Sequence, residues 1–207
     1  MLFRSDIVID KGIPFSQGLG GSSADASATI YCLAKMQGVC LCDAKIKQVC
    51  DSVGSDVYFM LHGGLGKIVD RSQMVKCGFA EMFGCLVTFK HQSDTAAIFR
   101  QYDKFVAQQM TDNDSLLAAI LSGDLVKANQ LCFNALQQPS RALNCYADNF
   151  INSCQTLGVK PTMTGSGSAY FVLCENKQKA EELASLLGGM GFSASVFQSV
   201  SSGIVEI

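Results

Sequence analysis

The stretch that decides the fold is Ile13-Pro14-Phe15-Ser16-Gln17-Gly18-Leu19-Gly20-Gly21-Ser22-Ser23-Ala24-Asp25-Ala26, in which three glycines lead into two serines. Glycine lets a backbone approach a ligand and present its N–H groups, and a helix that begins at the serines adds the positive end of its dipole. These residues predict a cradle for an anion such as phosphate. The stretch matches neither the Walker pattern nor the Gly-x-Gly-x-x-Gly dinucleotide pattern. The alternative is a tight turn whose serines only cap the helix.

The segments around this glycine loop predict a mixture of strands and helices. Residues 6–10 alternate polar and β-branched side chains, as a strand does. Ser22 and Ser23 are expected to cap a helix that ends near Met36, and Asp43 to cap a second helix. Further strands are expected at 65–69, 85–89, 161–164, 169–174, 193–198 and 204–207. Helical patterns fill 177–187 and also 94–157, where breaks indicate about four helices. The fold class is therefore expected to be α+β.

Composition excludes several classes of protein. The chain of 207 residues is 48% hydrophobic and 16% charged, which gives ample material for a core and too little charge for general disorder. Its net charge of −2 offers no basic surplus for a nucleic-acid backbone. It contains no apolar run long enough to cross a membrane, and its first residues lack the pattern of a signal peptide. We expect a soluble, cytoplasmic protein that binds neither nucleic acid nor membrane.

The ten cysteines are expected to be buried and reduced, because most of them lie in apolar stretches. The paired spacings of zinc sites are absent, and Cys40, Cys42 and Cys50 are the nearest approach to one. His62 and His91 lie near no other obvious ligand in the sequence. No protein-bound metal is therefore expected.

Three stretches carry a resemblance to a known family. Pro14 to Ala28 resembles the second motif of the GHMP small-molecule kinases, Pro-x-x-x-Gly-Leu-Gly-Ser-Ser-Ala. Residues 54–64, Gly-Ser-Asp-Val-Tyr-Phe-Met-Leu-His-Gly-Gly, resemble Gly-Ala-Asp-Val-Pro-Phe-Phe-Leu-x-Gly-Gly of the branch that phosphorylates 4-diphosphocytidyl-2-C-methyl-D-erythritol. Residues 163–171 resemble the third motif of the same branch, Met-Ser-Gly-Ser-Gly-Ser-x-x-Phe. The three stretches also occur in the order of the family.

The resemblance implies a two-lobed GHMP kinase fold: the remainder of a ribosomal-protein-S5-like N-terminal lobe in residues 1–83 and a ferredoxin-like C-terminal lobe in residues 84–207, with the ligand site between them. It implies ATP-dependent phosphorylation of a small-molecule substrate at its 2-hydroxyl, in non-mevalonate isoprenoid biosynthesis, by a monomer or homodimer. Asp56 is the implied catalytic base, and magnesium accompanies the nucleotide. The implied contacts to ATP are Pro14, Gly18, Leu19, Gly20, Gly21, Ser22 and Ser23, and those to substrate are Gly165, Ser166 and Gly167.

The sequence also departs from the family pattern. No stretch matches the family's Pro-x-Lys-Ile-Asn-Leu segment, whose lysine assists the aspartate, and neither Lys11 nor His62 matches it by motif. We therefore expect an impaired kinase; the alternatives are a non-catalytic nucleotide-binding or phosphate-binding remnant that works through a partner, and another GHMP kinase. Two residue roles also stay open. Asp56 could instead be a helix N-cap, and residues 165–167 could be only a hairpin turn.

Overall fold

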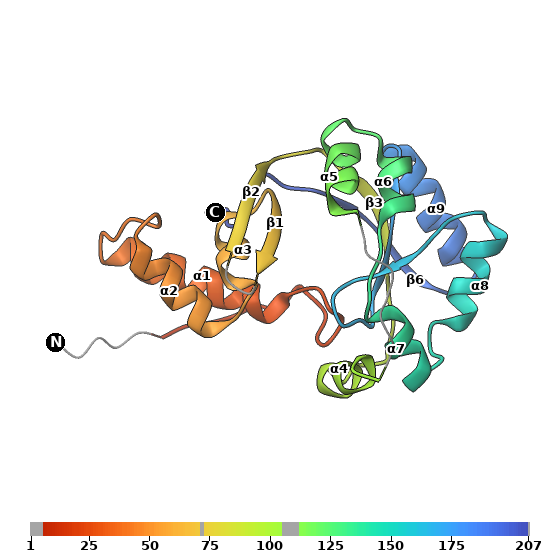
Figure 1. The fold of residues 1–207 in the computed structure, drawn as a ribbon, viewed down its shortest axis with the longest axis horizontal. Coiled ribbons are helices and arrows are strands. Elements are labelled where there is room, and N and C mark those ends of the chain that lie inside the picture. The colour runs from red at the N-terminus through yellow and green to blue at the C-terminus, as the bar shows by residue number, and fades with distance from the viewer. Residues whose placement is uncertain (1–5, 71–72, 105–111, 207) are drawn as a thin grey trace.

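The computed structural model describes residues 6–70, 73–104 and 112–206, which form two lobes joined by crossing segments (Figure 1). The first lobe contains α1 (Gly21–Met36), α2 (Ala44–Val53), α3 (Val57–His62), β1 (Leu65–Asp70) and β2 (Gln73–Gly78). The second contains β3 (Phe83–Thr88), α4 (Thr95–Tyr102), α5 (Asn113–Leu121), α6 (Leu125–Leu131), α7 (Gln137–Leu143), α8 (Asp148–Thr156), β4 (Thr162–Met163), β5 (Tyr170–Cys174), α9 (Lys177–Gly189) and β6 (Ser193–Gln198). The α+β class is confirmed.

The first lobe is built from three helices whose apolar faces meet. Cys50, Val57 and Leu61 are buried at the centre of this cluster. Asp43 caps α2 as predicted, because its side chain accepts a hydrogen bond from the N–H of Lys45 at 2.8 Å. Beside α3, β1 and β2 pair in antiparallel fashion (Figure 1). The first of these strands was predicted and the second was missed.

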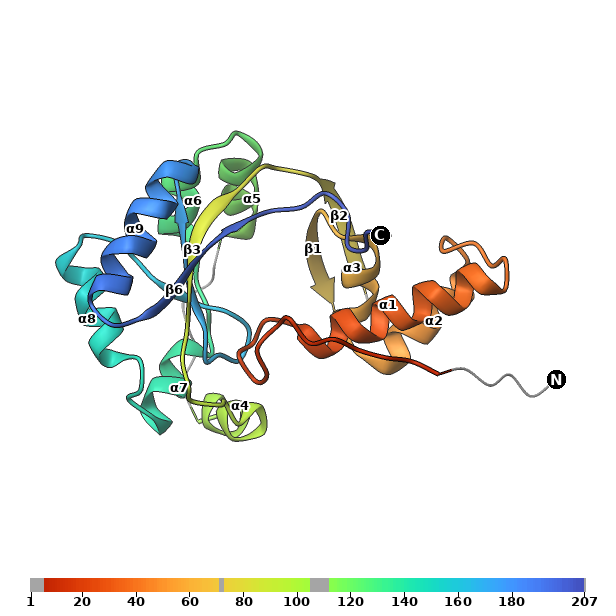
Figure 2. The ribbon, with the colours of Figure 1, turned by 180° about the vertical axis from the view of Figure 1, so that it is seen from behind.

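The second lobe is an antiparallel sheet with the strand order β4-β5-β3-β6. Alternate residues of β5 face opposite sides, as the pleat requires. Tyr170 and Val172 join the apolar cluster under α8 and α9, whereas Phe171 and Leu173 join the cluster under α5 and α6. Figure 2 shows these two pairs of helices on opposite faces of the sheet. Since both faces are covered, the mostly apolar residues 85–89, where a strand was expected, fit the central place of β3 in the sheet.

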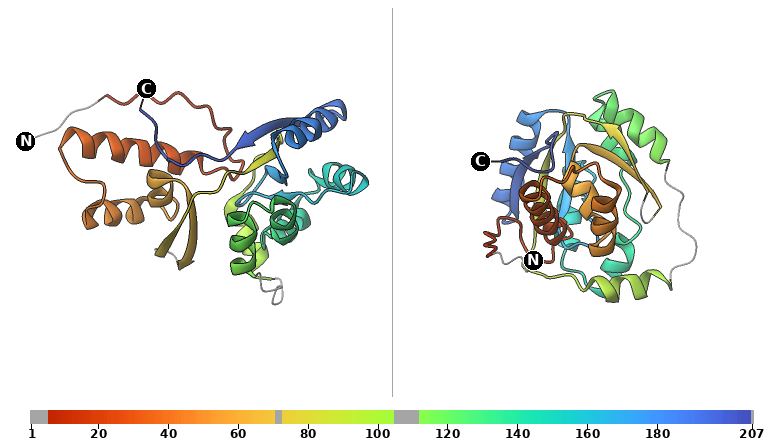
Figure 3. Two further views of the ribbon diagram at one scale, coloured as in Figure 1. Left: turned by 90° about the horizontal axis from the view of Figure 1, so that it is seen from above. Right: turned by 90° about the vertical axis from the view of Figure 1, so that its left-hand side faces the viewer.

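The chain ends on the first lobe rather than the second (Figures 2 and 3). After β6, Ile204 packs into the helical cluster of the first lobe, and Glu206 accepts hydrogen bonds from the Tyr31 hydroxyl and the Lys35 amine of α1. Gly203 passes so close to α3 that a Cβ there would overlap the carbonyl oxygen of Met60. The lobes are thus connected by two segments, 79–82 and 199–203, and the second of these holds α3 in place.

Some predictions of local structure are wrong. Residues 6–10 are no strand, and Ile7 and Val8 are 56% and 94% exposed. A β-branched alternation favours a strand only where a neighbour accepts its hydrogen bonds, and no strand of the described chain pairs with this segment. Residues 204–206 form no strand either, and Ile207 lies outside the described residues. In the section 94–157 the described part of the chain forms five helices, one more than the breaks in the pattern indicated.

The cysteines differ in part from the expectation. Five of them are buried: Cys50, Cys85, Cys132, Cys154 and Cys174. Burial raises the pKa of the Cys85 thiol to about 11, which keeps it protonated and unreactive. Cys32 and Cys145 are exposed, however, and Cys40 and Cys42 form a disulfide, so the expectation is wrong for these four. Among the helices of residues 6–70, 73–104 and 112–206, none has the length and apolar character that a membrane span needs.

Candidate anion-binding site

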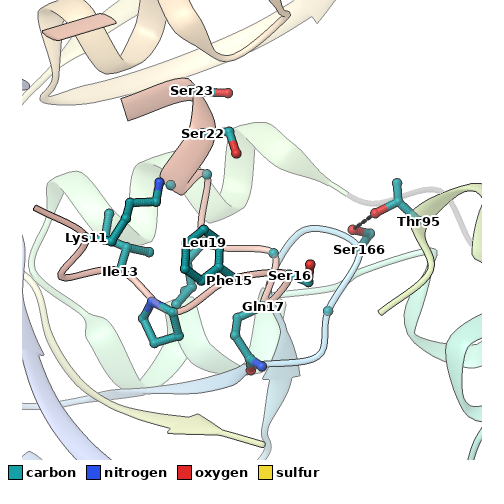
Figure 4. A pocket seen from close by; sticks show the side chains of 15 residues that line it. Lys11, Ile13, Phe15, Ser16, Gln17, Leu19, Ser22, Ser23, Thr95 and Ser166 are labelled. Atoms are coloured by element: carbon teal, nitrogen blue, oxygen red, sulfur yellow. Dashed lines mark hydrogen bonds between the residues drawn. The ribbon is translucent and has the colours of Figure 1, made fainter. Parts of the chain in front are cut away.

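A pocket of about 250 Å³ lies where the two lobes meet (Figure 4). Its wall contains every predicted residue of the first glycine loop and two predicted residues of the third motif. The lining residues are Lys11, Ile13, Pro14, Phe15, Ser16, Gln17, Gly18, Leu19, Gly20, Gly21, Ser22, Ser23, Thr95, Ser166 and Gly167. Two stretches almost 150 positions apart in the sequence therefore line the same pocket.

The start of α1 differs from the prediction in a way that frees the two serines. The N-cap is Gly20, with φ of 69°, and no side chain of the described residues caps the helix. Glycine adopts this left-handed conformation readily, so the helix begins one residue before Ser22. The N–H groups of its first turn have no partner within the helix, and neither serine hydroxyl serves as a cap. These groups lie at the mouth of a 16-residue helix, where the dipole favours an anion.

The two glycine loops touch through their backbones. Gly18 has φ of 72°, and a Cβ there would overlap the carbonyl oxygen of Thr164 and lie 2.8 Å from the nitrogen of Gly167. The Thr164 hydroxyl donates a hydrogen bond to the Gly18 carbonyl at 2.9 Å. Gly165 has φ of 51°, and a Cβ there would lie 2.8 Å from the carbonyl oxygen of Gly18. Only residues without a side chain allow this approach, so the glycines shape the pocket.

The third-motif loop is both a hairpin turn and part of the pocket wall. It joins β4 to β5, and the N–H of Gly167 donates to the carbonyl of Thr164 at 2.8 Å. On the pocket side, the hydroxyl of Ser166 lies 2.8 Å from that of Thr95 at the start of α4 (Figure 4). Thr95 was missed by sequence reasoning, because nothing in its surroundings matches a motif.

Lys11 is the cation among the residues that line this pocket, although it matches no family motif. Its amine forms an ion pair with Asp25 of α1 and lies 5.4 Å from the ring centre of Phe15. Both partners of the ion pair are largely covered, with side chains 22% and 28% exposed. Figure 4 shows the amine beside the first residues of α1. The ion pair also gives Asp25 a role, because its carboxylate holds the Lys11 amine near the start of α1.

Asp56 does not line this pocket but lies on the helix that packs against it. It occupies the N-cap position of α3, yet its side chain makes no capping hydrogen bond and accepts one from the Ser55 hydroxyl at 3.1 Å. The carboxylate is exposed. A Cβ on Gly20 would overlap the methyl group of Met60, one helical turn after Asp56, or about 5.4 Å along the axis. Asp56 therefore lies one helical turn from a residue that contacts the glycine loop, and it is unused as a cap.

His62, at the end of α3, packs against its own helix and is not part of the pocket. Its Nε2 atom is buried and has no hydrogen-bond partner in the part of the chain that the structure describes, and its ring packs edge-on against Tyr58 at 4.6 Å between centroids. Burial and the nearby Lys76 lower the pKa of His62, so it stays neutral near pH 7. It does not line the pocket.

Comparisons with known proteins agree with this architecture. Residues 3–64 match the model for the GHMP kinases N terminal domain and residues 116–188 that for the GHMP kinases C terminal domain. A 4-diphosphocytidyl-2-C-methyl-D-erythritol kinase of Nocardia farcinica is 30% identical over 198 residues, which is 92% of this chain and 64% of that protein. The enzyme of the same name in Corynebacterium diphtheriae is 30% identical over 187 residues, 89% of this chain and 60% of that one.

Solved structures show the same fold. The crystal structure of a 4-(cytidine 5'-diphospho)-2C-methyl-D-erythritol kinase has a TM-score of 0.75 at 21% identity, and covers 91% of this chain and 68% of that one. A homoserine kinase from Cytophaga hutchinsonii has a TM-score of 0.69 at 18% identity, and covers 93% and 69%. The chain spans less than two thirds of the length of the two curated relatives. Both family models, one on each lobe, and the shared fold show that the chain belongs to the GHMP kinases.

Proposed function

We propose that the chain binds the phosphates of ATP in the pocket between its lobes and transfers the γ-phosphoryl group to the 2-hydroxyl of 4-diphosphocytidyl-2-C-methyl-D-erythritol. The observation that carries the proposal is the meeting of two glycine loops, a free helix N-terminus and Lys11 around one hollow. The relatives' names and the match of residues 54–64 support the substrate. We also propose that the lobes divide near residue 83 and that the protein is a cytoplasmic monomer or homodimer.

The proposed ATP contacts are those implied by the resemblance, with Lys11 added. The first-turn N–H groups of α1 and the Lys11 amine would bind phosphate oxygens, while Pro14 and Leu19 shape the loop. The hydroxyls of Ser22 and Ser23 are oxygen donors left free by the Gly20 cap, which suits Mg²⁺ bound through the nucleotide and its waters. When bound, Mg²⁺ neutralises phosphate charge.

The chain's own groups account for the rest of the proposed reaction. The substrate oxygen attacks the γ-phosphorus, the bond to the β-phosphate oxygen breaks, and ADP leaves. Asp56 orients the hydroxyl and accepts its proton. Gly165, Ser166 and Gly167 would contact the substrate from the second lobe. Since phosphoryl transfer depends mainly on positioning and charge, a loop, one cation and one carboxylate are a sufficient set.

A substrate panel tests the function. The chain is incubated with radiolabelled ATP, magnesium and, separately, 4-diphosphocytidyl-2-C-methyl-D-erythritol, homoserine or mevalonate, beside the Nocardia farcinica relative. We expect label transfer to the first compound alone, more slowly than by the longer relative. Transfer to homoserine or mevalonate instead would assign another GHMP activity. MgATP binding without any transfer would show a non-catalytic binding protein.

Lys11→Gln is expected to weaken MgATP binding by about 10- to 100-fold, the value of a charge-assisted hydrogen bond of roughly 1.5–3 kcal/mol. Isothermal titration measures the affinity. Lys35→Gln is the matched control, because it removes a lysine that pairs with Glu206 at the far end of α1. Equal affinities for the two variants would show that Lys11 serves only its ion pair with Asp25.

A further inference from the structure

We infer that Gln17 is a positioning residue, whose buried side-chain amide fastens the first glycine loop to the second lobe and holds the loop in its anion-binding shape. The identity of the anion rests on the proposed function, whereas the fastening does not. We call the set Gln17, Phe89, His91 and Ser168 the Gln17 clamp.

The amide of Gln17 uses its full hydrogen-bonding capacity within the clamp. Nε2 donates to the carbonyls of Phe89 at 2.7 Å and His91 at 3.2 Å. Oε1 accepts from the N–H of Phe89 at 3.3 Å and from the hydroxyl of Ser168 at 2.9 Å. Two donors and two acceptor sites are all that such an amide has. The residue is 4% exposed, so water cannot replace these bonds.

The partners of this amide are themselves fixed. Ser168 is fully buried, and its one hydroxyl hydrogen is shared between Gln17 Oε1 and the carbonyl of His91. The His91 ring stacks on Tyr146 at 4.4 Å between centroids and lies 3.3 Å from the Asn144 amide. The clamp therefore joins the loop to a rigid part of the second lobe.

Gln17 lies within the first glycine loop, so its hydrogen bonds affect the conformation of the loop that would bind the anion. It stands between Ser16, with φ of 54°, and Gly18, with φ of 72°. A loop as rich in glycine as residues 18–21 has many other accessible conformations, so its shape has to be held by contacts. Its main-chain carbonyl adds a bond from the N–H of Ala169 at 3.1 Å, so Gln17 holds both pocket loops (Figure 4). Without the clamp, the loop would adopt its anion-binding conformation in only a fraction of the molecules. The apparent affinity for MgATP would then fall in proportion to that fraction.

A merely structural role for Gln17 can be tested against Asn129, which is a matched buried amide. Asn129 is 8% exposed, its Nδ2 donates to the carbonyl of Lys160 at 3.1 Å, and its Oδ1 accepts from the N–H of Leu173 at 2.9 Å. Neither Asn129 nor its partners line the pocket. Gln17→Glu and Asn129→Asp each replace a donating NH₂ by an oxygen and keep the other oxygen. Each change also adds one negative charge, and Gln17 lines the pocket, so loop exchange is measured without nucleotide, where this charge has no phosphate to repel.

The experiment compares these two variants with the wild type by thermal unfolding, MgATP titration and amide hydrogen exchange of residues 17–24. We expect both to lower Tm, but only Gln17→Glu to weaken MgATP binding by about tenfold or more and to speed exchange in the loop by a similar factor. The inference is overturned if Gln17→Glu matches Asn129→Asp in affinity and in loop exchange.

Two further outcomes are covered by the same design. If the wild type binds no MgATP, the proposed function fails, and the exchange rates of the loop alone decide whether the clamp exists. If Gln17→Glu does not fold, Ser168→Ala replaces it, because this change removes one bond to Oε1 and keeps the other three. Ser168→Ala is expected to change the same two readouts by a smaller factor, and unchanged readouts would refute the clamp.

Discussion

Gly18→Ala is expected to abolish measurable MgATP binding. A Cβ at residue 18 would overlap the carbonyl oxygen of Thr164 and crowd the backbone of Gly167, and neither is a flexible side chain that could move aside. The left-handed backbone adds about 1–2 kcal/mol for any residue with a Cβ. The two pocket loops must therefore separate, and the loop that presents the first-turn N–H groups loses its shape. Isothermal titration with MgATP measures the effect.

Gly12→Ala is the matched control for this result. Gly12 lies six residues earlier on the same segment, and a Cβ there would meet nothing within 4 Å. Gly12→Ala should bind MgATP as the wild type does, and thermal unfolding of both variants separates lost binding from lost folding. If Gly18→Ala bound MgATP within about threefold of the wild type, a difference of roughly 0.7 kcal/mol, the close approach of the loops would be irrelevant to the site.

The elements that could be predicted are those whose signal is local. The N-cap of α2 at Asp43 and the buried strand β3 depend on short-range chemistry and on apolar pattern, and both are present. The segment 6–10 has an equally good strand pattern, but pairing requires a second chain segment, which no local pattern supplies. Ser22 and Ser23 are good caps by propensity, yet the N-cap is the left-handed Gly20, so both serines lie within the first turn of α1.

The two glycine loops of the candidate site could be predicted from the sequence, whereas other residues that line the same pocket could not. The glycine spacing indicated the two loops, because glycine at those places is needed for the turns themselves. Lys11 and Thr95 lie in the same pocket only because the lobes fold together, and neither belongs to a motif. Gln17 was part of the quoted stretch, but its partners at 89 and 91 follow a strand more than seventy positions away. Such contacts are tertiary and leave no periodic signal.

Asp56→Ala is expected to lower turnover by about 10³-fold, within the usual range for loss of a general base, and to leave MgATP affinity unchanged. The carboxylate caps nothing and is bonded only to the neighbouring Ser55 hydroxyl among the hydrogen bonds of the described chain. Its removal should therefore cost little stability. Label transfer from ATP to 4-diphosphocytidyl-2-C-methyl-D-erythritol measures turnover, and denaturant unfolding measures stability.

Asp43→Ala distinguishes the catalytic role from the capping role. Asp43 is a true cap, so its loss should cost about 1 kcal/mol of unfolding free energy and leave turnover intact. The N-cap interpretation of Asp56 requires the opposite, namely a stability loss like that of Asp43→Ala and near-normal transfer. Because the two aspartates occupy equivalent positions before α2 and α3 but only the Asp43 side chain caps its helix, the pair of variants separates proton transfer from helix capping.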